Sequence, residues 1–485
     1  MSQPLLRASA AEHGLRPRAV LDFLDDLDQE LHSLMILRRG VVLVEGWWAP
    51  YRPDQVQLLY SVSKSFTSTA VGLAVAEGRL DLDSPLLDHL DGLGIDPAGP
   101  RIRSLTVADA LRMATGHAED VLWQSFVADP HEPLCGFFGI EPEHEPGSLF
   151  AYNNAAGYAV AAVVQRVTGM PLLDYLRPRV LDPLGIDRAY WHAYPPDRQL
   201  GYSGLHLTTE ALARFGELYR CRGRWGDRQL IPAAWVDRAT SALTPNPAET
   251  GPDRQQGYGF QFWRSRYGYR ADGAFGQFCL VLPEQEAVIV ITSAAADAQA
   301  LLATVWQHLL PGFSSRRLSG WMIDQDQATL QDRLGRLRLP TALSAAATGE
   351  RAYSTRAGAE AAPRPQVRIT GVTAADDDTW RVELTHNEPM LPAELDWFEV
   401  AAEPDRWLDT VVELPGEREL RLAASGGWLD DIFRLDLVLL HTPHRMTLWY
   451  APATGGTISE WVSAPLPGMS LFGLAVPREV AVSRP

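Results

Sequence analysis

The chain has 485 residues and a formal net charge of −17 at pH 7. A chain of this length exceeds what one hydrophobic core usually holds, so we expect two domains. The acidic balance argues against nucleic acid and anionic membranes as partners, because both attract clustered positive charge. No apolar run approaches the roughly 20 residues that span a bilayer and no export signal is visible, so we expect a cytoplasmic protein that does not bind membranes.

The first predicted elements are a β-hairpin and a helix. Residues 32–48 carry dense aliphatic side chains on both sides of Arg39-Gly40, which is typical of two buried strands joined by a turn. The following stretch, SVSKSFTSTAVGLAVAEG, has apolar residues at helical spacing and ends at Gly78, a common residue just beyond the end of a helix. Ser61 therefore lies at the start of this helix.

The middle of the chain is predicted to be helical, with sheet returning after it. Between about residues 104 and 240, helical patterns alternate with loops rich in Pro and Gly, which indicates an all-helical insertion. Strands are predicted at residues 278–282 and 287–293, followed by a helix around residues 296–309. We therefore expect an α/β domain over residues 1–312 that begins and ends with sheet.

The remainder is predicted to be a linker and a second, all-β domain. Residues 313–365 contain one short amphipathic stretch and then a segment of low pattern, which favours a linker. Residues 366–485 contain alternating stretches such as TWRVELTH and FRLDL, which are typical of strands with one buried face. We expect a smaller all-β domain here, with a barrel as one candidate arrangement.

The basic residues carry a strong compositional signal. Of the 43 Lys and Arg residues, 42 are Arg, and Lys64 is the one Lys. Arg stays charged in proteins, whereas a buried Lys can lose its proton and act as a base. The three cysteines, Cys135, Cys221 and Cys279, are far apart and form no metal-binding pattern. We expect them to be small buried hydrophobes, with neither a metal nor another cofactor bound.

Two short motifs carry chemistry. Ser61 and Lys64 are three positions apart, so in the first turn of a helix both side chains lie on one face within hydrogen-bond reach. The helix N-terminus also favours negative charge that develops on an attacked carbonyl. In PGSLFAYNNAAGY, Tyr152 and Asn154 are two apart, which places them on one side of an extended segment.

These motifs resemble those of the penicillin-recognising serine hydrolases, the superfamily of class C β-lactamases, DD-peptidases and related esterases. The S-x-x-K motif is similar to Ser61-Val62-Ser63-Lys64 and the Y-x-N motif to Tyr152-Asn153-Asn154. The resemblance covers roughly residues 20 to 310. It implies a β-lactamase-like fold, an antiparallel sheet flanked by helices plus an all-helical subdomain. It also implies Ser61 as nucleophile, Lys64 and Tyr152 as catalytic partners, and Asn154 as a substrate-binding residue.

The third motif of that superfamily, Lys or His followed by Thr-Gly or Gly-Gly, is altered here. The corresponding stretch reads Gly268-Tyr269-Arg270, followed by Ala271-Asp272-Gly273. The resemblance implies that Ala271, Asp272 and Gly273 border the substrate, with the Ala271 and Ser61 N–H groups as the oxyanion donors. Arg270 either replaces the missing cation or is a solvated surface residue.

The expected activity is hydrolysis of a small ester or amide through an acyl-enzyme on Ser61. A β-lactamase, a DD-peptidase or a D-aminopeptidase is the alternative within the same chemistry. An inactive binding or regulatory protein that keeps the fold is the alternative outside it. The expected partner is a small-molecule substrate; neither the oligomeric state nor the role of the second domain can be derived from the sequence.

Overall fold

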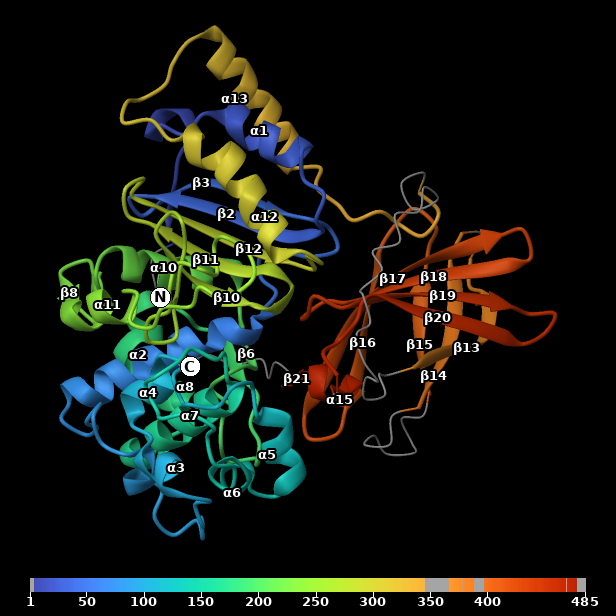
Figure 1. The fold of residues 1–485 in the computed structure, drawn as a ribbon. Helices are drawn as coiled ribbons and strands as arrows, with labels where there is room; N and C mark the ends of the chain where they lie inside the picture. Colours follow the sequence, from blue (N-terminus) through green and yellow to red (C-terminus); the bar gives the residue numbers. More distant parts are fainter. Residues whose placement is uncertain (1–3, 345–365, 377, 388–396, 468, 478–485) are drawn as a thin grey trace, which may run out of the picture.

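A seven-stranded sheet forms the centre of the N-terminal region, residues 4–344 (Figure 1). The structure is a computed structural model, and it describes residues 4–344, 366–376, 378–387, 397–467 and 469–477. In spatial order the strands are β1 (Leu6–Arg7), β3 (Val41–Trp47), β2 (Leu31–Arg38), β12 (Ala287–Ser293), β11 (Gln277–Leu282), β10 (Tyr269–Gly273) and β9 (Trp263–Arg264). All neighbours pair antiparallel except β1 and β3, which are parallel.

The predicted hairpin and closing strands are confirmed. Strands β2 and β3 are joined by Arg39 and Gly40, whose φ angles of 51° and 78° are both left-handed, as a tight hairpin turn requires. Strand β12 pairs with β2 and places Ile289 opposite Ile36, so the two ends of the region meet in the middle of the sheet. Every residue of β2 and β12 is buried, because helices cover both faces.

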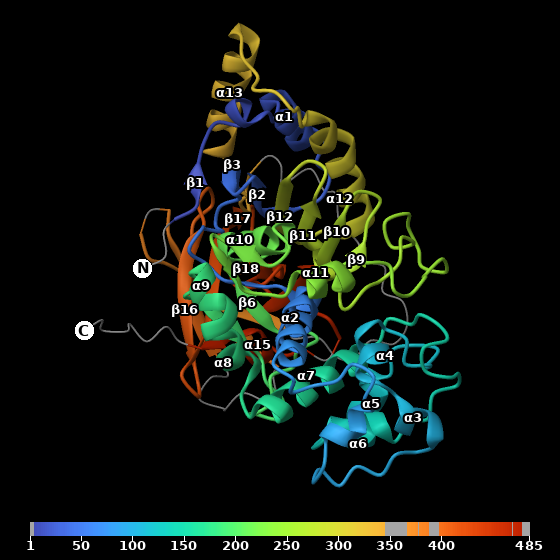
Figure 2. The ribbon, with the colours of Figure 1, turned by 90° about the vertical axis from the view of Figure 1, so that its left-hand side faces the viewer.

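Helices form a layer on each face of the sheet, as Figures 1 and 2 show. One layer contains α1 (Pro17–Asp25), α12 (Ala298–Thr304), the π-helical η6 (Val305–Leu309) and α13 (Trp321–Leu334). The other contains α2 (Ser63–Ala76), preceded by the turn η2 (Tyr60–Val62), together with α10 (Thr209–Arg220) and α11 (Ala233–Ala239). The predicted helix after Ser61 is thus confirmed, and it ends before Gly78, whose φ is 68°.

The region that was predicted to be all-helical, about residues 104–240, includes α10 and α11 of the layer that contains α2, and most of its other helices lie below α2 (Figure 2). These other helices are α3 (Pro100–Ser104), α4 (Val107–Leu111), α5 (Leu122–Ala128), α6 (Pro133–Phe138), α7 (Asn154–Thr168), α8 (Leu172–Leu176) and α9 (Asp182–Leu184). The prediction of an all-helical insertion is wrong in part, because short strands interrupt it. These are β5 (Ala189–Trp191), β6 (Leu205–Leu207), which also pairs with β4 (Gln57–Leu58), and the hairpin of β7 (Arg224–Trp225) and β8 (Arg228–Gln229). Strands of two or three residues are too short to give an alternation in the sequence.

Helix α13 falls inside the segment predicted to be a linker. It packs against α1, and its Leu330 is fully buried in the core on that face of the sheet. Residues 345–365 of the predicted linker lie outside the described residues. The boundaries 1–312, 313–365 and 366–485 stay predictions.

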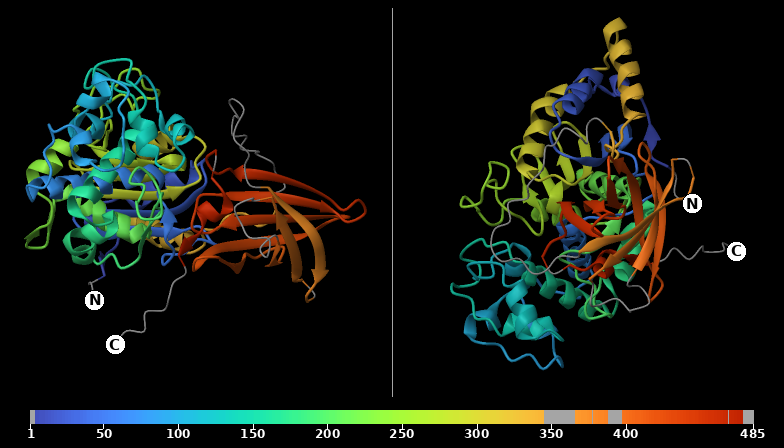
Figure 3. Two further views of the ribbon diagram at one scale, coloured as in Figure 1. Left: turned by 90° about the horizontal axis from the view of Figure 1, so that it is seen from below. Right: turned by 90° about the vertical axis from the view of Figure 1, so that its right-hand side faces the viewer.

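The C-terminal β region, residues 366–477, consists of two sheets that project from one side of the N-terminal region (Figures 1 and 3). The first contains β13 (Val367–Ala374), β14 (Trp380–His386) and β15 (Trp397–Ala402). The second contains β16 (Leu408–Leu414), β17 (Arg418–Leu429), β18 (Ile432–Leu439), β19 (Arg445–Ala451) and β20 (Gly456–Ser463), with β21 (Val476–Pro477) paired to β17; a short helix α15 (Leu471–Leu474) precedes β21.

The all-β prediction is confirmed, but the barrel is not formed. Val382 and Leu384 of β14 and Leu435 of β18 point into one shared core, as their alternation predicts. The two sheets face each other across this core, and no backbone ladder joins them among the described residues, so the structure does not close into a barrel.

Two further expectations can be compared with the structure. Cys279 is buried, but Cys135 and Cys221 are only half-buried, because they lie at the outer side or end of their helices; all three are free thiols. Within the described part of the chain, no helix has both the length and the apolar character that crossing a membrane requires.

Candidate active site

Ser61 lies in η2, the single turn that leads directly into α2. It is half-buried, whereas Ser63 and Ser65 are fully buried. The hydroxyls of Ser63 and Ser65 each donate to a backbone carbonyl, at 2.6 and 2.8 Å. Of these three serines, Ser61 is the one that is both accessible and within 3.0 Å of the Lys64 amine. Ser61 therefore has the accessibility and the contact with Lys64 that a nucleophile requires, and its role stays a prediction.

The Lys64 amine is buried at the centre of a cluster of oxygens. Its Nζ lies 3.0 Å from Ser61 Oγ, 2.7 Å from Asn154 Oδ1 and 2.8 Å from the Tyr202 carbonyl oxygen. The residue is 1% exposed. Burial lowers the pKa of Lys64 from 10.5 to about 7, and the nearby carboxylates of Asp120 and Asp272 offset only part of this effect. A substantial fraction of the amine is therefore neutral near pH 7.

The neutral amine has a defined orientation in this cluster. A neutral NH₂ group has two N–H donors and one lone pair. Asn154 Oδ1 and the Tyr202 carbonyl can only accept hydrogen bonds, so they take both N–H groups. The lone pair then faces Ser61 Oγ, which can donate its proton to it. In this arrangement the Lys64 amine can remove a proton from the Ser61 hydroxyl. Among the described residues, no group of three or more His, Cys, Asp or Glu side chains is placed to hold a metal ion.

Asp120 fixes the orientation of Asn154 and was not found from the sequence. Its Oδ2 accepts a hydrogen bond from Asn154 Nδ2 at 2.6 Å, and its Oδ1 accepts one from the Asn154 backbone N–H at 2.9 Å. Since a carboxylate accepts but does not donate, the Nδ2 side of the amide must face Asp120, which leaves Oδ1 facing Lys64. No spacing links Asp120 to Asn154, and a backbone carbonyl such as that of Tyr202 has no sequence signature, so only the fold reveals both partners.

The aromatic ring of Tyr152 lies beside the Lys64 amine. The Lys64 Nζ is 4.9 Å from the centre of the Tyr152 ring, and that ring is stacked on Trp263 at 5.6 Å. Burial raises the pKa of Tyr152 above its usual value of 10, although a hydrogen bond to Ser61 acts in the opposite direction. The phenol therefore stays protonated near neutral pH. A protonated phenol can donate a proton, so of these two side chains the neutral Lys64 amine is the one able to take up a proton.

Strand β10, which carries the altered third motif, runs beside the turn that carries Ser61. A Cβ atom at Gly273 would lie 2.3 Å from the Leu59 carbonyl oxygen, so this close approach requires glycine. Ala271 is 2% exposed and packs into the core next to α2. The proximity of β10 to η2 is what oxyanion donors from Ser61 and Ala271 require; their role stays a prediction.

Comparison with known proteins identifies the family. The Beta-lactamase family profile matches residues 25–308, which is more than half of the chain. The chain belongs to the β-lactamase family. It is 27% identical over 325 residues to the 6-aminohexanoate-dimer hydrolase of Paenarthrobacter ureafaciens, a match that covers 60% of this chain and 80% of that protein.

Further relatives of this β-lactamase-family chain differ in their activities. It is 27% identical over 179 residues to the lovastatin esterase of Penicillium rubens, covering 32% of this chain and 44% of that protein. A solved Bacillus anthracis structure, described provisionally as a 6-aminohexanoate-dimer hydrolase, has 19% identity and a TM-score of 0.52, covering 64% of this chain and 86% of that one. The structural match supports the β-lactamase-like fold alone. Together the comparisons establish a hydrolase family whose named members include a 6-aminohexanoate-dimer hydrolase and an esterase.

The interpretation of Arg270 as a solvated surface residue is wrong, whereas its role as a substitute cation stays a prediction. Its side chain is fully buried, its Nε donates to Asp272 Oδ2 at 2.8 Å, and its Nη1 donates to the Ser265 hydroxyl at 2.6 Å. Positions 270 and 272 share one face of β10, so the guanidinium and the carboxylate pair with each other. In this member of the β-lactamase family, neither side chain is a free charge at the strand edge.

A different arginine, Arg254, provides a guanidinium near the site. It is half-buried, and among the described residues its guanidinium makes no hydrogen bond or ion pair. It lies over the Trp263 ring at 5.7 Å, and Trp263 in turn stacks on Tyr152. Arg254 and Asp272 both line a cavity of about 410 Å³, one wall of which is formed by residues of the C-terminal β region. The loop of Arg254 has no recognisable motif, which is why the sequence did not reveal it.

Proposed function

We propose that this chain hydrolyses a small ester or amide through an acyl-enzyme on Ser61. The observation that carries the proposal is the oxygen cluster around Lys64, which directs the amine lone pair at Ser61 Oγ. The lone pair takes the hydroxyl proton as Oγ bonds to the substrate carbonyl carbon. The oxyanion that forms is stabilised by the N–H groups of Ser61 and Ala271.

The remaining steps use the same residues. The proton on Lys64 passes to the leaving alcohol or amine, with the protonated Tyr152 phenol as the relay, and the C–O or C–N bond breaks. Water then attacks the acyl-enzyme, Lys64 accepts its proton, and the acid is released as Ser61 regains its hydrogen. The names of the two relatives, one an amide hydrolase and one an esterase, support both substrate classes.

The altered third motif argues for esters or simple amides over β-lactams or peptides. Arg270 is held in an ion pair with Asp272, so its charge is already balanced before a substrate carboxylate binds. A panel of p-nitrophenyl esters, D-amino-acid anilides and a chromogenic cephalosporin tests this ranking. We expect turnover of the short esters, together with an acyl adduct on Ser61 in a rapidly quenched digest. Rapid cephalosporin hydrolysis with inert esters would reverse the ranking.

We also propose that Arg254 recognises an acidic group on the substrate. Of the other charged residues that line the cavity, Asp272 pairs with Arg270, Glu30 pairs with Arg445 at 2.9 Å, and the Asp297 carboxylate accepts the backbone N–H groups of Gln299 and Ala300 at 2.9 Å. Among the described residues that line the cavity, Arg254 is the cation without an ion pair, and it lies one ring away from Tyr152.

Replacement Arg254→Gln is expected to raise KM for the mono-p-nitrophenyl ester of glutaric acid about tenfold, the loss typical of one charge-assisted hydrogen bond. KM for the uncharged p-nitrophenyl valerate should stay the same. Arg238→Gln is a matched control, because Arg238 also lies over an aromatic ring, Phe260 at 5.0 Å, but does not line the cavity. Equal changes for both esters would show that Arg254 has no role in charge recognition.

A further inference from the structure

The residue directly before Ser61 is held by the C-terminal β region. Tyr60 is 2% exposed, and its ring is part of the core that the two C-terminal sheets enclose. Its hydroxyl lies 2.5 Å from Nε2 of His444, a buried residue directly before β19. A side chain of the N-terminal region thus ends inside the C-terminal region, one residue away from the predicted nucleophile.

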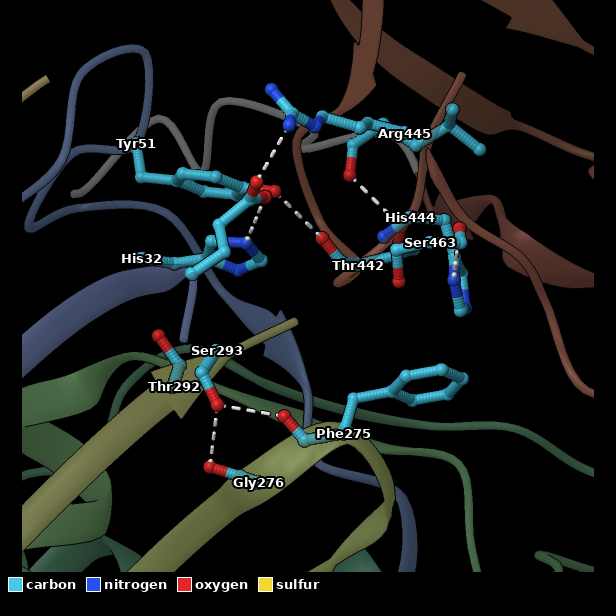
Figure 4. A network of polar contacts seen from close by, with 12 residues as sticks. His32, Tyr51, Phe275, Gly276, Thr292, Ser293, Thr442, His444, Arg445 and Ser463 are labelled. Atoms are coloured by element: carbon cyan, nitrogen blue, oxygen red, sulfur yellow. Dashed lines mark hydrogen bonds and ion pairs between the residues drawn. The ribbon is translucent and has the colours of Figure 1, made fainter. Parts of the chain in front are cut away.

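The neighbours of His444 determine the direction of this hydrogen bond. Its Nδ1 lies 3.2 Å from the Ser463 carbonyl oxygen, which only accepts, so Nδ1 carries the hydrogen (Figure 4). Nε2 is then the acceptor, and the Tyr60 hydroxyl donates to it. Burial lowers the pKa of His444 to about 3, so this neutral form persists across the working pH range.

The backbone of Tyr60 needs such support. Its φ is 49°, in the left-handed region that a bulky residue adopts only when its surroundings hold it there. The Tyr60 carbonyl also accepts the Ser63 hydroxyl at 2.6 Å. Because Tyr60 and Ser61 share a peptide bond, the position of Tyr60 sets the direction of the Ser61 N–H and side chain.

His444 also contacts the segment that follows β10. The Phe275 ring lies 5.1 Å from the His444 ring and 5.4 Å from the Tyr60 ring, so the three rings form one cluster. Phe275 is left-handed as well, with φ 64°, and its carbonyl accepts a hydrogen bond from Ser293 at 2.7 Å (Figure 4). One histidine therefore contacts Tyr60, directly before Ser61, and Phe275, in the turn directly after the strand that carries Ala271.

We propose that the C-terminal β region is a positioning element of the active site, and that His444 is its positioning residue. Through Tyr60 and Phe275 it fixes the turn of Ser61 relative to β10, so that nucleophile and oxyanion donors keep their productive geometry. This inference rests on the proposed function of Ser61. It assigns to the second region a role in the chemistry in addition to its packing.

The test compares His444→Leu, which removes the acceptor, with Tyr60→Phe, which keeps the ring and removes only the hydroxyl. Each is expected to lower kcat for p-nitrophenyl valerate about 10- to 100-fold with little change in KM, because displaced reacting groups slow chemistry more than binding. The double variant should be no slower than the slower single variant. His444→Gln, which restores an acceptor near the Nε2 position, should recover much of the loss.

Tyr51→Phe is the matched control. The Tyr51 hydroxyl donates to the Thr442 carbonyl at 3.1 Å across the same interface (Figure 4). It is linked to His444 only indirectly, through Thr442, whose Oγ1 accepts the His444 backbone N–H at 3.1 Å. We expect Tyr51→Phe to have the same kcat as the wild-type protein and a melting temperature similar to that of the wild-type protein. Equal kcat losses in Tyr51→Phe and Tyr60→Phe, or unchanged kcat in Tyr60→Phe, would overturn the inference. A wild-type protein that neither hydrolyses esters nor acylates Ser61 would refute the proposed function itself, and the inference with it.

Discussion

Replacement Ser61→Ala is expected to abolish labelling by a fluorophosphonate probe and to lower kcat/KM for short esters by at least about 10,000-fold, as loss of a nucleophile does in serine hydrolases. The half-buried Ser61 hydroxyl is the one that faces the Lys64 lone pair, so no neighbouring serine can replace it. Labelling detected by gel fluorescence and intact mass gives the result directly.

The control for this experiment is Ser68→Ala. Ser68 lies on the same helix α2, is fully buried, and has a hydroxyl without a hydrogen-bond partner among the described residues. The variant should label at the wild-type rate. Wild-type protein that labels no better than Ser61→Ala would favour the alternative of an inactive binding protein.

Replacement Lys64→Arg is expected to lower kcat about 1,000-fold, within the range that general base catalysis contributes. Arginine keeps the positive charge but cannot give up its proton. The variant therefore removes the ability of residue 64 to act as a base while it preserves the charge at that position. In the wild type, the pKa of Lys64 is lowered to about 7, and the active form is the neutral amine. Activity should therefore rise about tenfold per pH unit below pH 7 and level off above it.

The pH profile of kcat/KM, measured with an uncharged ester, checks this prediction. Lys64→Arg should lack the rise with a midpoint near pH 7, whereas Ser68→Ala should keep it. A wild-type profile that is flat between pH 5 and 9 would contradict the assignment of Lys64 as the base.

Local patterns were sufficient to predict several elements of the fold. The hairpin of β2 and β3, the helix after Ser61 and the strands β11 and β12 all have dense apolar residues bounded by a Gly or Pro turn, and all were confirmed. The separation of Ser61 and Lys64 depends only on helix geometry, so the contact between them also follows from the sequence. The short strands between residues 189 and 229 form because they pair with segments that are distant or adjacent in the fold. With two or three residues each, they are too short to show an alternation of apolar and polar residues in the sequence.

The parts of the site that the sequence did not reveal depend on long-range packing. Asp120 reaches Asn154 from a loop, and Arg254 reaches the cavity from another. Arg270 was misassigned because charged residues are usually solvated, whereas here the partner two positions along β10 allows full burial. The contact of His444 with Tyr60 joins residues 384 positions apart, and neither residue has a recognisable motif.

The single lysine has a consequence for spectroscopy. Protein grown with ¹⁵N-lysine would contain one side-chain amine nitrogen, so its resonance could be assigned without any mutation. The change of that chemical shift with pH reports the protonation of the amine, independently of turnover. The ionisation of the proposed base can therefore be followed in the resting protein and compared directly with the rate profile.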